Sequence, residues 1–502
     1  MPQAPKNVIV VLLDSLNRHL VGAYGGTEFE TPNLDRLAAR SVQFTRHHTG
    51  SLPCMPARHD ILVGALDFLW RPWGSIEVWE DAITYSLRGA GVTSMLVSDH
   101  PHLFESGGEN YHTDFNAWEY VRGHESDPWK TVPDPSFIGA PTQPARRHMN
   151  YDLSRTWFRE EEDYPGPHTM ATAAEWLRTS AKEHDRFFLF VDEFDPHEPF
   201  DTPERWATMY DDTWDGARMI WPPYVVGAIA NGVLTEREAQ HLRANYGSKL
   251  SMIDHWLGKV LDTLDELALW DDTAVILCTD HGHYLGERDT FGKPPLPIHR
   301  EMGHIPLLIA WPSVAPRECD ALTTSVDIHA TIADVFDVTP EHRVHGRSLA
   351  PVVTGASDGV REHLLTGIWG NGVHVVDKET KYGRAPVGDN TPLVMWSNRW
   401  STMPVHAFPQ LRMPRPDRRA TLDHLFGSDV PVIRQPFAPG DPIPYWGMRG
   451  PREHVLFDID ADPLETANLV GSVREKEAID LLRAAMEEAD APKEQYERLG
   501  IA

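Results

Sequence analysis

The sequence contains little cysteine, with three residues among 502. Three widely spaced cysteines cannot build a disulfide framework, and an odd number leaves at least one thiol free. This low content is typical of a reducing compartment. The three residues are Cys54, Cys278 and Cys319.

Long hydrophobic runs are also scarce near the N-terminus. The opening segment MPQAPKNVIVVLLDS carries one lysine and a short apolar run, VIVVLL, before an aspartate. Such a run is too short to span a membrane as a helix, and no small-residue cleavage site follows it. We therefore expect a cytoplasmic protein that begins directly on its first strand and has no membrane partner.

Basic residues are in the minority, with 46 Lys and Arg against 74 Asp and Glu and a formal net charge of −28. This excess of acid disfavours non-specific binding to nucleic acids and anionic membranes, so we predict no nucleic-acid partner. An anionic substrate would then need strong positive charge at the site itself. That requirement is a first indication of a bound metal ion.

What the sequence does contain is apolar segments of two kinds. Short β-branched runs predict buried parallel strands, and stretches with helical spacing alternate with them. This alternation predicts a doubly wound, mostly parallel α/β sheet flanked by helices, whose ligands gather beyond the carboxyl ends of the strands. The strand candidates are residues 7–14, 93–99, 186–194, 273–282 and 305–312, and the helix candidates include 174–184 and 248–267.

Residues 31–44, TPNLDRLAARSVQF, predict a further helix, because Thr31 is a capping residue and Pro32 suits the first helical position. Residues 390–450 are rich in proline, tryptophan and arginine and lack periodicity. We predict long loops there, either a functional rim, a contact between subunits, or an irregular wrap over the core.

Two domains are predicted. Residues 1–365 form the catalytic α/β domain, and residues 366–502 form a smaller α+β domain with antiparallel strands and a helix. The helix is predicted over residues 474–489, where apolar side chains recur at helical spacing. The oligomeric state, monomer or homo-oligomer, stays open.

Polar side chains follow three of the predicted strands. Asp14 closes the first, the stretch 99–102 (DHPH) follows the second, and Asp280 and His281 follow a later one. Carboxylate oxygens and imidazole nitrogens that converge from rigid elements bind divalent cations. If their strands are neighbours, Asp14, Asp280 and His281 supply such a set.

A resemblance to a known family rests on several ordered segments. CMPAR, followed by Gly64, resembles the C-x-P-x-R signature of the formylglycine-dependent sulfatases of the alkaline phosphatase superfamily. The resemblance implies an alkaline-phosphatase-like fold and the hydrolysis of sulfate esters. Further segments that resemble landmarks of the family are NVIVVLLDS, TPNLDRLAARSVQF, DPHEPF, TDHGHYLGE, FGKPP and LFDIDADPLETANL.

The resemblance also gives Cys54 a role. Without the resemblance, two interpretations of Cys54 are open: a buried thiol in a turn, or a catalytic residue. In the family, a maturation enzyme oxidises this cysteine to formylglycine (3-oxoalanine), and the aldehyde hydrates to a geminal diol. One diol oxygen attacks the sulfur or phosphorus centre, and the other hydroxyl expels the bound sulfate as the aldehyde re-forms.

The family pattern implies roles for further residues of this sequence. Arg58 matches the signature arginine that orients the diol. His197 matches the histidine at the leaving oxygen, and Lys293 the lysine that neutralises the transferred group. His102 matches the base that assists collapse of the diol, and His100, His102, His197 and Lys293 are the predicted substrate-binding residues. The predicted ligands of one divalent metal ion are Asp14, Asp280, His281 and the side chain derived from Cys54.

The sequence departs from many sulfatases at three positions. His100 stands where they have lysine, Ser15 where they have a second aspartate, and His281 where they have asparagine. The Asp-His pair at 280–281 resembles the phosphonate monoester hydrolase and choline sulfatase branches. Fewer carboxylates and one imidazole shift the preferred ion from Ca²⁺ towards Mn²⁺, and either ion stays open.

The leading hypothesis is a metal-dependent hydrolase of small-molecule or saccharide sulfate esters. A close alternative is a phosphonate monoester or phosphodiester hydrolase with the same site. An alternative from another class is a degenerate, non-catalytic binding protein, because a fold alone does not establish a function. The alcohol half of the substrate is not identified by the sequence.

Overall fold

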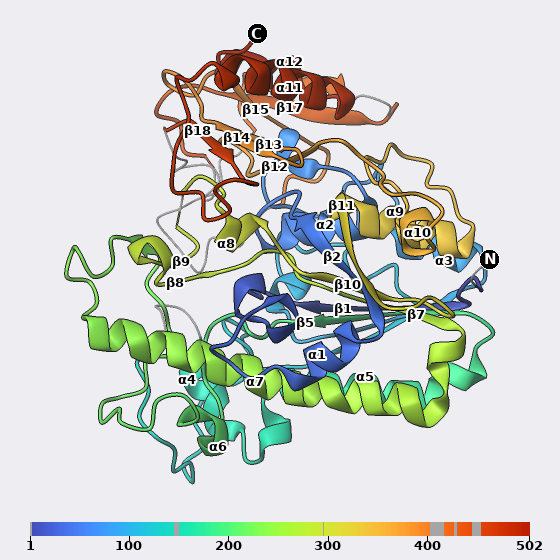
Figure 1. The fold of residues 1–502 in the computed structure, drawn as a ribbon, viewed down its shortest axis with the longest axis vertical. Helices are drawn as coiled ribbons and strands as arrows, with labels where there is room; N and C mark the ends of the chain where they lie inside the picture. The colour runs from blue at the N-terminus through green and yellow to red at the C-terminus, as the bar shows by residue number, and fades with distance from the viewer. Residues whose placement is uncertain (1–2, 145–149, 295, 402–415, 426–428, 444–452) are drawn as a thin grey trace.

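The computed structural model describes residues 3–144, 150–294, 296–401, 416–425, 429–443 and 453–502. A sheet with strand order β11-β2-β10-β7-β1-β5-β3-β4 lies at the centre of this part of the chain (Figure 1). Neighbouring strands are parallel except where β10 pairs with β2 and β7. The predicted mostly parallel sheet is therefore confirmed. Its strands are β1 (Asn7–Leu13), β2 (Ser41–His48), β3 (Thr93–Ser98), β4 (Ala117–Tyr120), β5 (Phe187–Glu193), β7 (Thr273–Cys278), β10 (Leu307–Ala310) and β11 (Arg317–Thr324).

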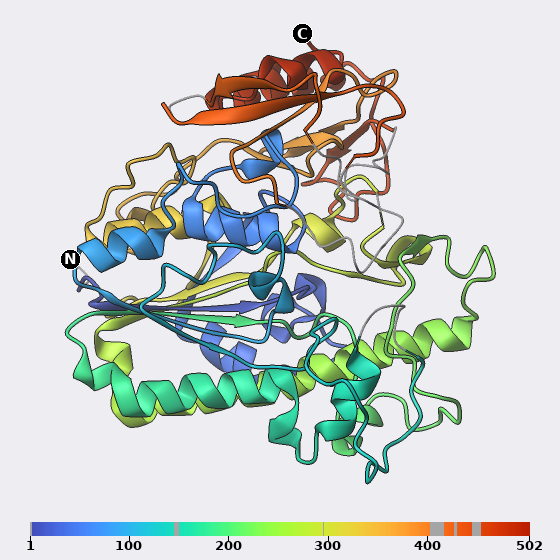
Figure 2. The same cartoon turned by 180° about the vertical axis from the view of Figure 1, so that it is seen from behind.

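Helices cover both faces of this sheet (Figures 1 and 2). Alternate side chains of β1 enter different cores, so Ile9 and Val11 pack with helices on one face while Val8 and Val10 pack with those on the other. This explains why β1 is apolar along its whole length. On the first face lie α1 (Pro32–Ala38), α5 (Pro165–Ser180) and α7 (Glu236–Leu267), and on the second lie α2 (Cys54–Val63), α3 (Ile83–Gly89), α9 (Val326–Phe336) and α10 (Ala350–Val353).

Strand register determines which polar side chains meet. Leu12 of β1 lies opposite Asp192 of β5 and Cys278 of β7. Because all three strands are parallel, Asp14, Asp192 and Asp280 reach the same carboxyl edge of the sheet. Shorter elements near this edge are α4 (Tyr151–Ser154), α6 (Glu204–Ala207), α8 (Arg300–Gly303) and the small sheet of β6 (Val225–Val226), β9 (Thr290–Gly292) and β8 (Tyr284–Leu285).

The C-terminal part contains two antiparallel sheets and a long helix, as predicted. The helix α11 (Arg474–Glu488) packs Leu482 and Met486 against Val375 and Leu456 of the larger sheet. The predicted boundary after residue 365 falls inside β12, and the division into domains stays a prediction. The strands are β12 (Leu364–Gly367), β13 (Val373–Val376), β14 (Thr380–Arg384) and β18 (Val455–Asp458), then β15 (Leu393–Ser397), β17 (Pro431–Phe437) and β16 (Thr421–His424), and a last helix is α12 (Lys493–Arg498).

One local prediction was confirmed only in part, and a second was wrong. The helix predicted in residues 31–44 ends at Ala38, and the stretch from Ser41 onwards is β2. Thr31 is the N-cap residue and Pro32 the first helical residue, as predicted, but the Thr31 side chain makes no capping hydrogen bond. The Asp254 carboxylate of α7 accepts the N–H groups of Asn33 and Leu34 in its place.

Residues 390–450 were predicted as loops, yet their described part contains β15, β16 and β17. The rest of that prediction, residues 402–415, 426–428 and 444–450, lies outside the described residues.

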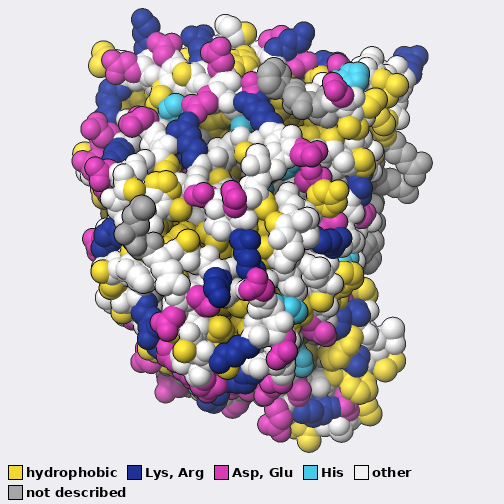
Figure 3. Space-filling model, turned by 90° about the vertical axis from the view of Figure 1, so that its right-hand side faces the viewer, with side chains coloured by type: hydrophobic (Ala, Val, Ile, Leu, Met, Phe, Trp, Pro, Cys, Tyr) yellow, Lys and Arg dark blue, Asp and Glu magenta, His cyan; other side chains and the backbone are white. Residues whose placement is uncertain are grey.

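Among the described residues, no helix has the length and apolar character needed to cross a membrane. Figure 3 shows acidic and basic side chains interspersed over one face of the molecule.

Candidate active site

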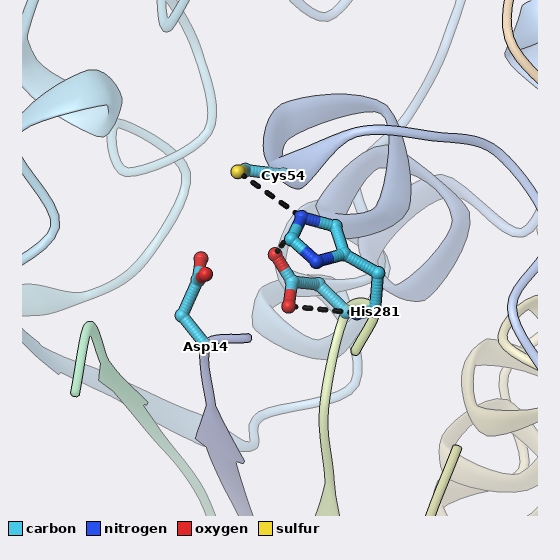
Figure 4. Close-up of side chains that lie close together, drawn as sticks. Asp14, Cys54 and His281 are labelled. Carbon is cyan, nitrogen blue, oxygen red and sulfur yellow. Dashed lines mark hydrogen bonds and ion pairs between the residues drawn. The ribbon is translucent and has the colours of Figure 1, made fainter. Parts of the chain in front are cut away.

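Four predicted metal ligands meet at the carboxyl edge of the central sheet. One side-chain donor atom each from Asp14, Cys54, Asp280 and His281 lies within 4.8 Å of the other three. Asp14 follows β1 and Asp280 follows β7, while Cys54 opens α2 above the sheet. Figure 4 shows Cys54 and His281 pointing towards one another, with Asp14 facing the same space.

Cys54 is the first residue of α2 and is 3% exposed. Its Sγ lies 3.3 Å from Nε2 of His281 and 4.0 Å from Nζ of Lys293. Burial, followed by the charge of Asp14, raises the pKa of the Cys54 thiol well above its usual value. An unmodified Cys54 is therefore held as a thiol and is a poor nucleophile.

The glycine that trails the CMPAR signature has a structural reason. Gly64 ends α2 in the left-handed region at φ 80°. A Cβ there would also lie 2.5 Å from Nδ1 of His329. Gly282 is required for a different reason, since a Cβ on it would lie 1.9 Å from the carbonyl oxygen of Glu301. The Asp-His-Gly sequence thus lets the backbone of α8 approach the site closely.

Arg58 is fully buried one turn after Cys54 and contacts three carboxylates. Its guanidinium lies 2.6 Å from Asp192 and 3.0 Å from both Asp14 and Asp280. It also donates to the Cys54 carbonyl at 3.2 Å. Burial lowers the pKa of Arg58, but these carboxylates raise it well above its usual value overall. Arg58 therefore carries a permanent charge that fixes the start of α2 over the sheet.

His281 is held in a form that suits metal binding. Its Nδ1 donates to the Gly282 carbonyl at 2.9 Å, which leaves the lone pair on Nε2 directed towards Cys54. Burial lowers the pKa of His281 to about 4, so the ring is neutral near pH 7. A neutral imidazole with an outer hydrogen bond is the usual arrangement of a histidine ligand.

Asp14 and Asp280 share the single positive charge of Arg58 with Asp192. Burial and the charge of Asp280 raise the pKa of Asp14 well above its usual value. Burial acts on Asp280 in the same direction, but His281 and Arg58 outweigh it and lower the pKa of Asp280. Two buried carboxylates with an imidazole and a further oxygen or sulfur donor fit a divalent cation.

Ser15, which replaces a second aspartate, is part of the same network. Its hydroxyl donates to Asp14 at 2.8 Å, and its backbone N–H donates to Asp280 at 3.0 Å. Nζ of Lys293 lies 3.3 Å from the same hydroxyl oxygen. The serine therefore orients both carboxylates without adding a negative charge.

His197 lies beside this group on the β5 side. Its Nδ1 donates to the Glu198 carbonyl at 2.7 Å, and its ring stacks on Phe194 at 4.2 Å between centroids. Burial lowers the pKa of His197 well below its usual value. The neutral ring therefore carries its lone pair on Nε2.

His100 and His102 differ from one another. His100 is fully buried 4.0 Å from Asp192, and burial lowers its pKa. His102 instead bonds to Glu105 through Nδ1 and lies 3.5 Å from Glu125 through Nε2. Burial lowers the pKa of His102, but the two carboxylates raise it overall. A raised pKa favours the protonated ring, whereas a base must be neutral to accept a proton. The base role of His102 therefore stays a prediction.

The sequence reasoning missed several residues of the site. Asp192 binds Arg58 and closes β5, and its signal was a carboxylate at the end of an apolar run. Glu198 accepts a hydrogen bond from Tyr224 at 2.5 Å, and its signal was its position directly after His197. The contact of Glu125 with His102 had no local signal, because 22 intervening residues separate them.

Together, the mixed sheet and the buried acid, imidazole and thiol group at its edge define an α/β protein of the alkaline phosphatase type. A sequence model described as Sulfatase matches residues 6–338. This is more than half of the chain, and the chain belongs to the sulfatase family. It is therefore an enzyme of the predicted class, the sulfuric ester hydrolases.

Curated relatives carry the same family names. The chain is 27% identical over 391 residues to the choline-sulfatase of Rhizobium meliloti (strain 1021), covering 71% of this chain and 73% of the relative. It is 26% identical over 411 residues to the multifunctional alkaline phosphatase superfamily protein PehA of Trinickia caryophylli, covering 69% of this chain and 76% of that protein.

A solved structure supports the fold. The phosphonate monoester hydrolase of Silicibacter pomeroyi superposes with a TM-score of 0.66 at 20% identity, covering 98% of this chain and 96% of that one. The predicted fold class and the resemblance to this branch of the superfamily are confirmed.

Proposed function

We propose that the protein hydrolyses sulfate esters through a formylglycine formed from Cys54, with one divalent metal ion held beside it. The observation that carries the proposal is the convergence of Cys54 with Asp14, Asp280 and His281, whose donor atoms lie within 4.8 Å of one another. Arg58 adds a buried positive charge to the same group.

The proposed ligands are Asp14, Asp280, His281 and the oxidised side chain at position 54. A bound divalent ion supplies Lewis-acid charge beside the transferred group and lowers the pKa of an oxygen ligand. One hydroxyl oxygen of the aldehyde hydrate would attack the sulfur and displace the alcohol, which takes up a proton. The second hydroxyl would then lose its proton and expel the sulfate as the aldehyde re-forms, and water would hydrate the aldehyde again.

The remaining residues stabilise charge around the reacting centre. Nζ of Lys293 lies 4.0 Å from Sγ of Cys54. Its positive charge stabilises the negative charge on the equatorial oxygens of the sulfuryl group during transfer. Arg58 holds the backbone at position 54 through its carbonyl. The positive charges of Lys293 and Arg58 offset the repulsion between the anionic sulfate group and the carboxylates of Asp14 and Asp280.

The histidines serve the leaving group and the release step. The backbone hydrogen bond of His197 is made by Nδ1, so Nε2 is the atom that faces the leaving group in this proposal. An anionic substrate beside the ring raises the pKa of His197 towards the range of a general acid. His102 and His100 lie further along the same side, near Phe194, and we assign them to substrate binding and to collapse of the diol.

Phosphonate monoester or phosphodiester hydrolysis is the second candidate. The imidazole ligand His281 and the relative from Trinickia caryophylli, named as multifunctional, favour it. The same imidazole favours Mn²⁺ over Ca²⁺ as the ion. The third alternative, a non-catalytic binding protein, is not supported, because the chain belongs to the sulfatase family and retains Cys54, Arg58, Asp14, Asp280 and His281.

Two measurements on protein made in its native host, where the maturation enzyme is available, test the proposal. Mass spectrometry of the peptide containing position 54 should find formylglycine and not cysteine. The ratio of kcat/KM for an aryl sulfate to that for an aryl phosphonate should exceed one. A ratio below one favours the second candidate, and an unmodified cysteine at position 54 contradicts the proposed nucleophile.

A further inference from the structure

A group of positively charged and imidazole side chains lies outside the proposed active site. It contains Arg18 and His19, which follow β1, His48 at the end of β2, and Arg300 and His304 at α8. We call it the Arg18–Arg300 cluster. Nε of Arg300 lies 3.1 Å from Nε2 of His19, and the rings of His48 and His304 stack at 4.9 Å between centroids.

Neither guanidinium of the cluster forms an ion pair with a carboxylate within the described part of the chain. Arg18 contacts the Thr45 carbonyl at 3.5 Å and lies over the ring of Tyr24 at 4.2 Å. Nε of Arg18 is enclosed by protein without a hydrogen-bond partner. Two neighbouring guanidiniums without a carboxylate partner leave positive charge that a bound anion would balance.

A carboxylate close to the cluster, that of Glu465, already has other partners. Glu465 binds Nζ of Lys381 at 2.6 Å and Nδ1 of His299 at 3.1 Å. Its contact with Arg300 is to the backbone N–H at 3.0 Å and not to the guanidinium. The positive charge of Arg18 and Arg300 is therefore not neutralised by Glu465.

The side chains of the cluster repel one another electrostatically. Burial, together with the charge of Arg300, lowers the pKa of Arg18 to about 10. Burial and the charges of Arg300 and Arg18 lower the pKa of His19 to about 3. Near pH 7 the cluster thus combines two charged guanidiniums with neutral imidazoles, a set that binds oxyanions through charge-assisted hydrogen bonds.

The elements that carry the cluster are joined directly to the segments that carry the proposed metal ligands. Arg18 follows Asp14 by four residues. Thr49, next to His48, donates to the Asp280 carbonyl at 2.9 Å. Gly282, next to His281, donates to the carbonyl of Met302 in α8 at 3.0 Å. In Figure 1, the carboxyl end of β1 is the end of the sheet away from the N-terminus, and α8 lies at that same end.

We propose that Arg18 and Arg300, with His19, bind an oxyanion such as a sulfate, phosphate or carboxylate group, distinct from the group that is hydrolysed. The anion is either a second acidic group of the substrate or a free anion such as released sulfate. The first source rests on the proposed function, whereas anion binding itself does not.

Selenate binding tests the site. Full-length protein crystallised with selenate should give an anomalous selenium peak within hydrogen-bond distance of Arg18 and Arg300. In solution, Arg300→Gln and Arg18→Gln should each weaken selenate binding at this site by about tenfold, the value of one charge-assisted hydrogen bond. Arg46→Gln is the matched control, because Arg46 is a half-buried arginine of β2 that already pairs with Asp460.

The outcomes are distinct. A second selenate per chain that is lost in Arg300→Gln or Arg18→Gln but kept in Arg46→Gln supports the proposal. Melting temperatures without selenate identify any variant that fails to fold, and the other variant then decides. A single selenate per chain at Arg58 and Lys293, or binding that is equal in all variants, overturns it.

Kinetics separates the two sources of the anion. Arg300→Gln should raise KM about tenfold for an aryl sulfate that carries a carboxylate, and leave KM for a neutral aryl sulfate unchanged, if the site holds a second substrate group. Unchanged KM for both, with selenate binding lost, assigns the site to a free anion. If neither ester is hydrolysed, the proposed function fails while the selenate result still stands.

Discussion

Two adjacent residues of α2, Arg58 and His59, belong to two buried networks with similar composition and different chemistry. Arg58 joins the group at the carboxyl edge of the sheet. His59 bonds to Glu80 at 2.9 Å, and donor atoms of His59, Asp67 and Glu80 also lie within 4.8 Å of one another. By distance alone, both groups qualify as metal sites.

The protonation of the histidine separates them. Burial lowers the pKa of His59, but the charges of Asp67 and Glu80 raise it to about 9, whereas burial lowers the pKa of His281 to about 4. A protonated imidazole donates hydrogen bonds and cannot bind a metal ion. The His59 network is thus a closed set of ion pairs, completed by Arg71. The neutral His281, with Nδ1 bonded to the Gly282 carbonyl, keeps the lone pair of Nε2 for a metal ion.

The largest effect that separates the two networks should come from Cys54→Ala. We expect kcat for an aryl sulfate to fall by at least about 10³-fold, because the nucleophile is lost. Stopped assays on purified protein from the native host measure this. Cys319→Ala, at a half-buried cysteine of β11, is the matched control and should keep activity. Activity of Cys54→Ala within tenfold of the parent protein would contradict the proposed nucleophile.

Exchanging one acid in each network should give opposite results. Asp280→Asn should remove the metal ion and lower kcat by about 10²-fold or more, with the loss of a ligand charge. Asp67→Asn should leave the metal content unchanged and lower the free energy of unfolding by about 2–3 kcal/mol, because Arg71 loses a buried partner. Elemental analysis and urea unfolding measure the two quantities. Equal metal loss in both variants would remove the distinction between the networks.

The His59 network should also make stability depend on pH. The folded pKa of His59, about 9, lies above its ordinary value of 6.5, so the bound proton stabilises the fold fully below pH 6.5. This contribution is lost as the pH rises through about 9, since the folded state then releases the proton that favoured it. Urea unfolding between pH 6 and pH 10 should detect the fall. His59→Gln should lack this part of the dependence, and an identical profile in both proteins would be evidence against a protonated His59.

The smallest effect is expected from His281→Asn, which places an amide oxygen where the imidazole is. The ratio of Mn²⁺ to Ca²⁺ affinity should fall by about tenfold, because a nitrogen ligand is exchanged for an oxygen. Metal titration of the purified variant, followed by activity, measures the ratio. Substitution of His59 by asparagine is the control and should leave the ratio unchanged.

The sequence was sufficient for those parts of the molecule whose signal is local. β1, β5 and β7 are apolar on both faces, so their positions and the acids Asp14 and Asp280 at their ends could be predicted. The motif around Cys54 and Arg58 is likewise a short contiguous pattern. Ion pairs between distant segments, such as Arg58 with Asp192, could not be predicted, because they depend on the register of neighbouring strands.

β2 illustrates the opposite case. Its half-buried Gln43, Thr45 and Arg46 interrupt the apolar pattern, and the strand forms because it pairs with β10 and β11 far along the chain. The surroundings of His102 were missed for a similar reason, since Glu125 approaches it from a separate loop and raises the pKa of the ring. The missed features are those created by tertiary contacts.

The enclosure of position 54 has a consequence for how the protein is made. A side chain that is 3% exposed at the start of α2 offers no access to the active site of another protein. If Cys54 is oxidised as proposed, the oxidising enzyme has to reach it on the nascent or unfolded chain, before α2 docks on the sheet. Folding rate and maturation rate would then compete, and a chain that folds too early would be permanently inactive.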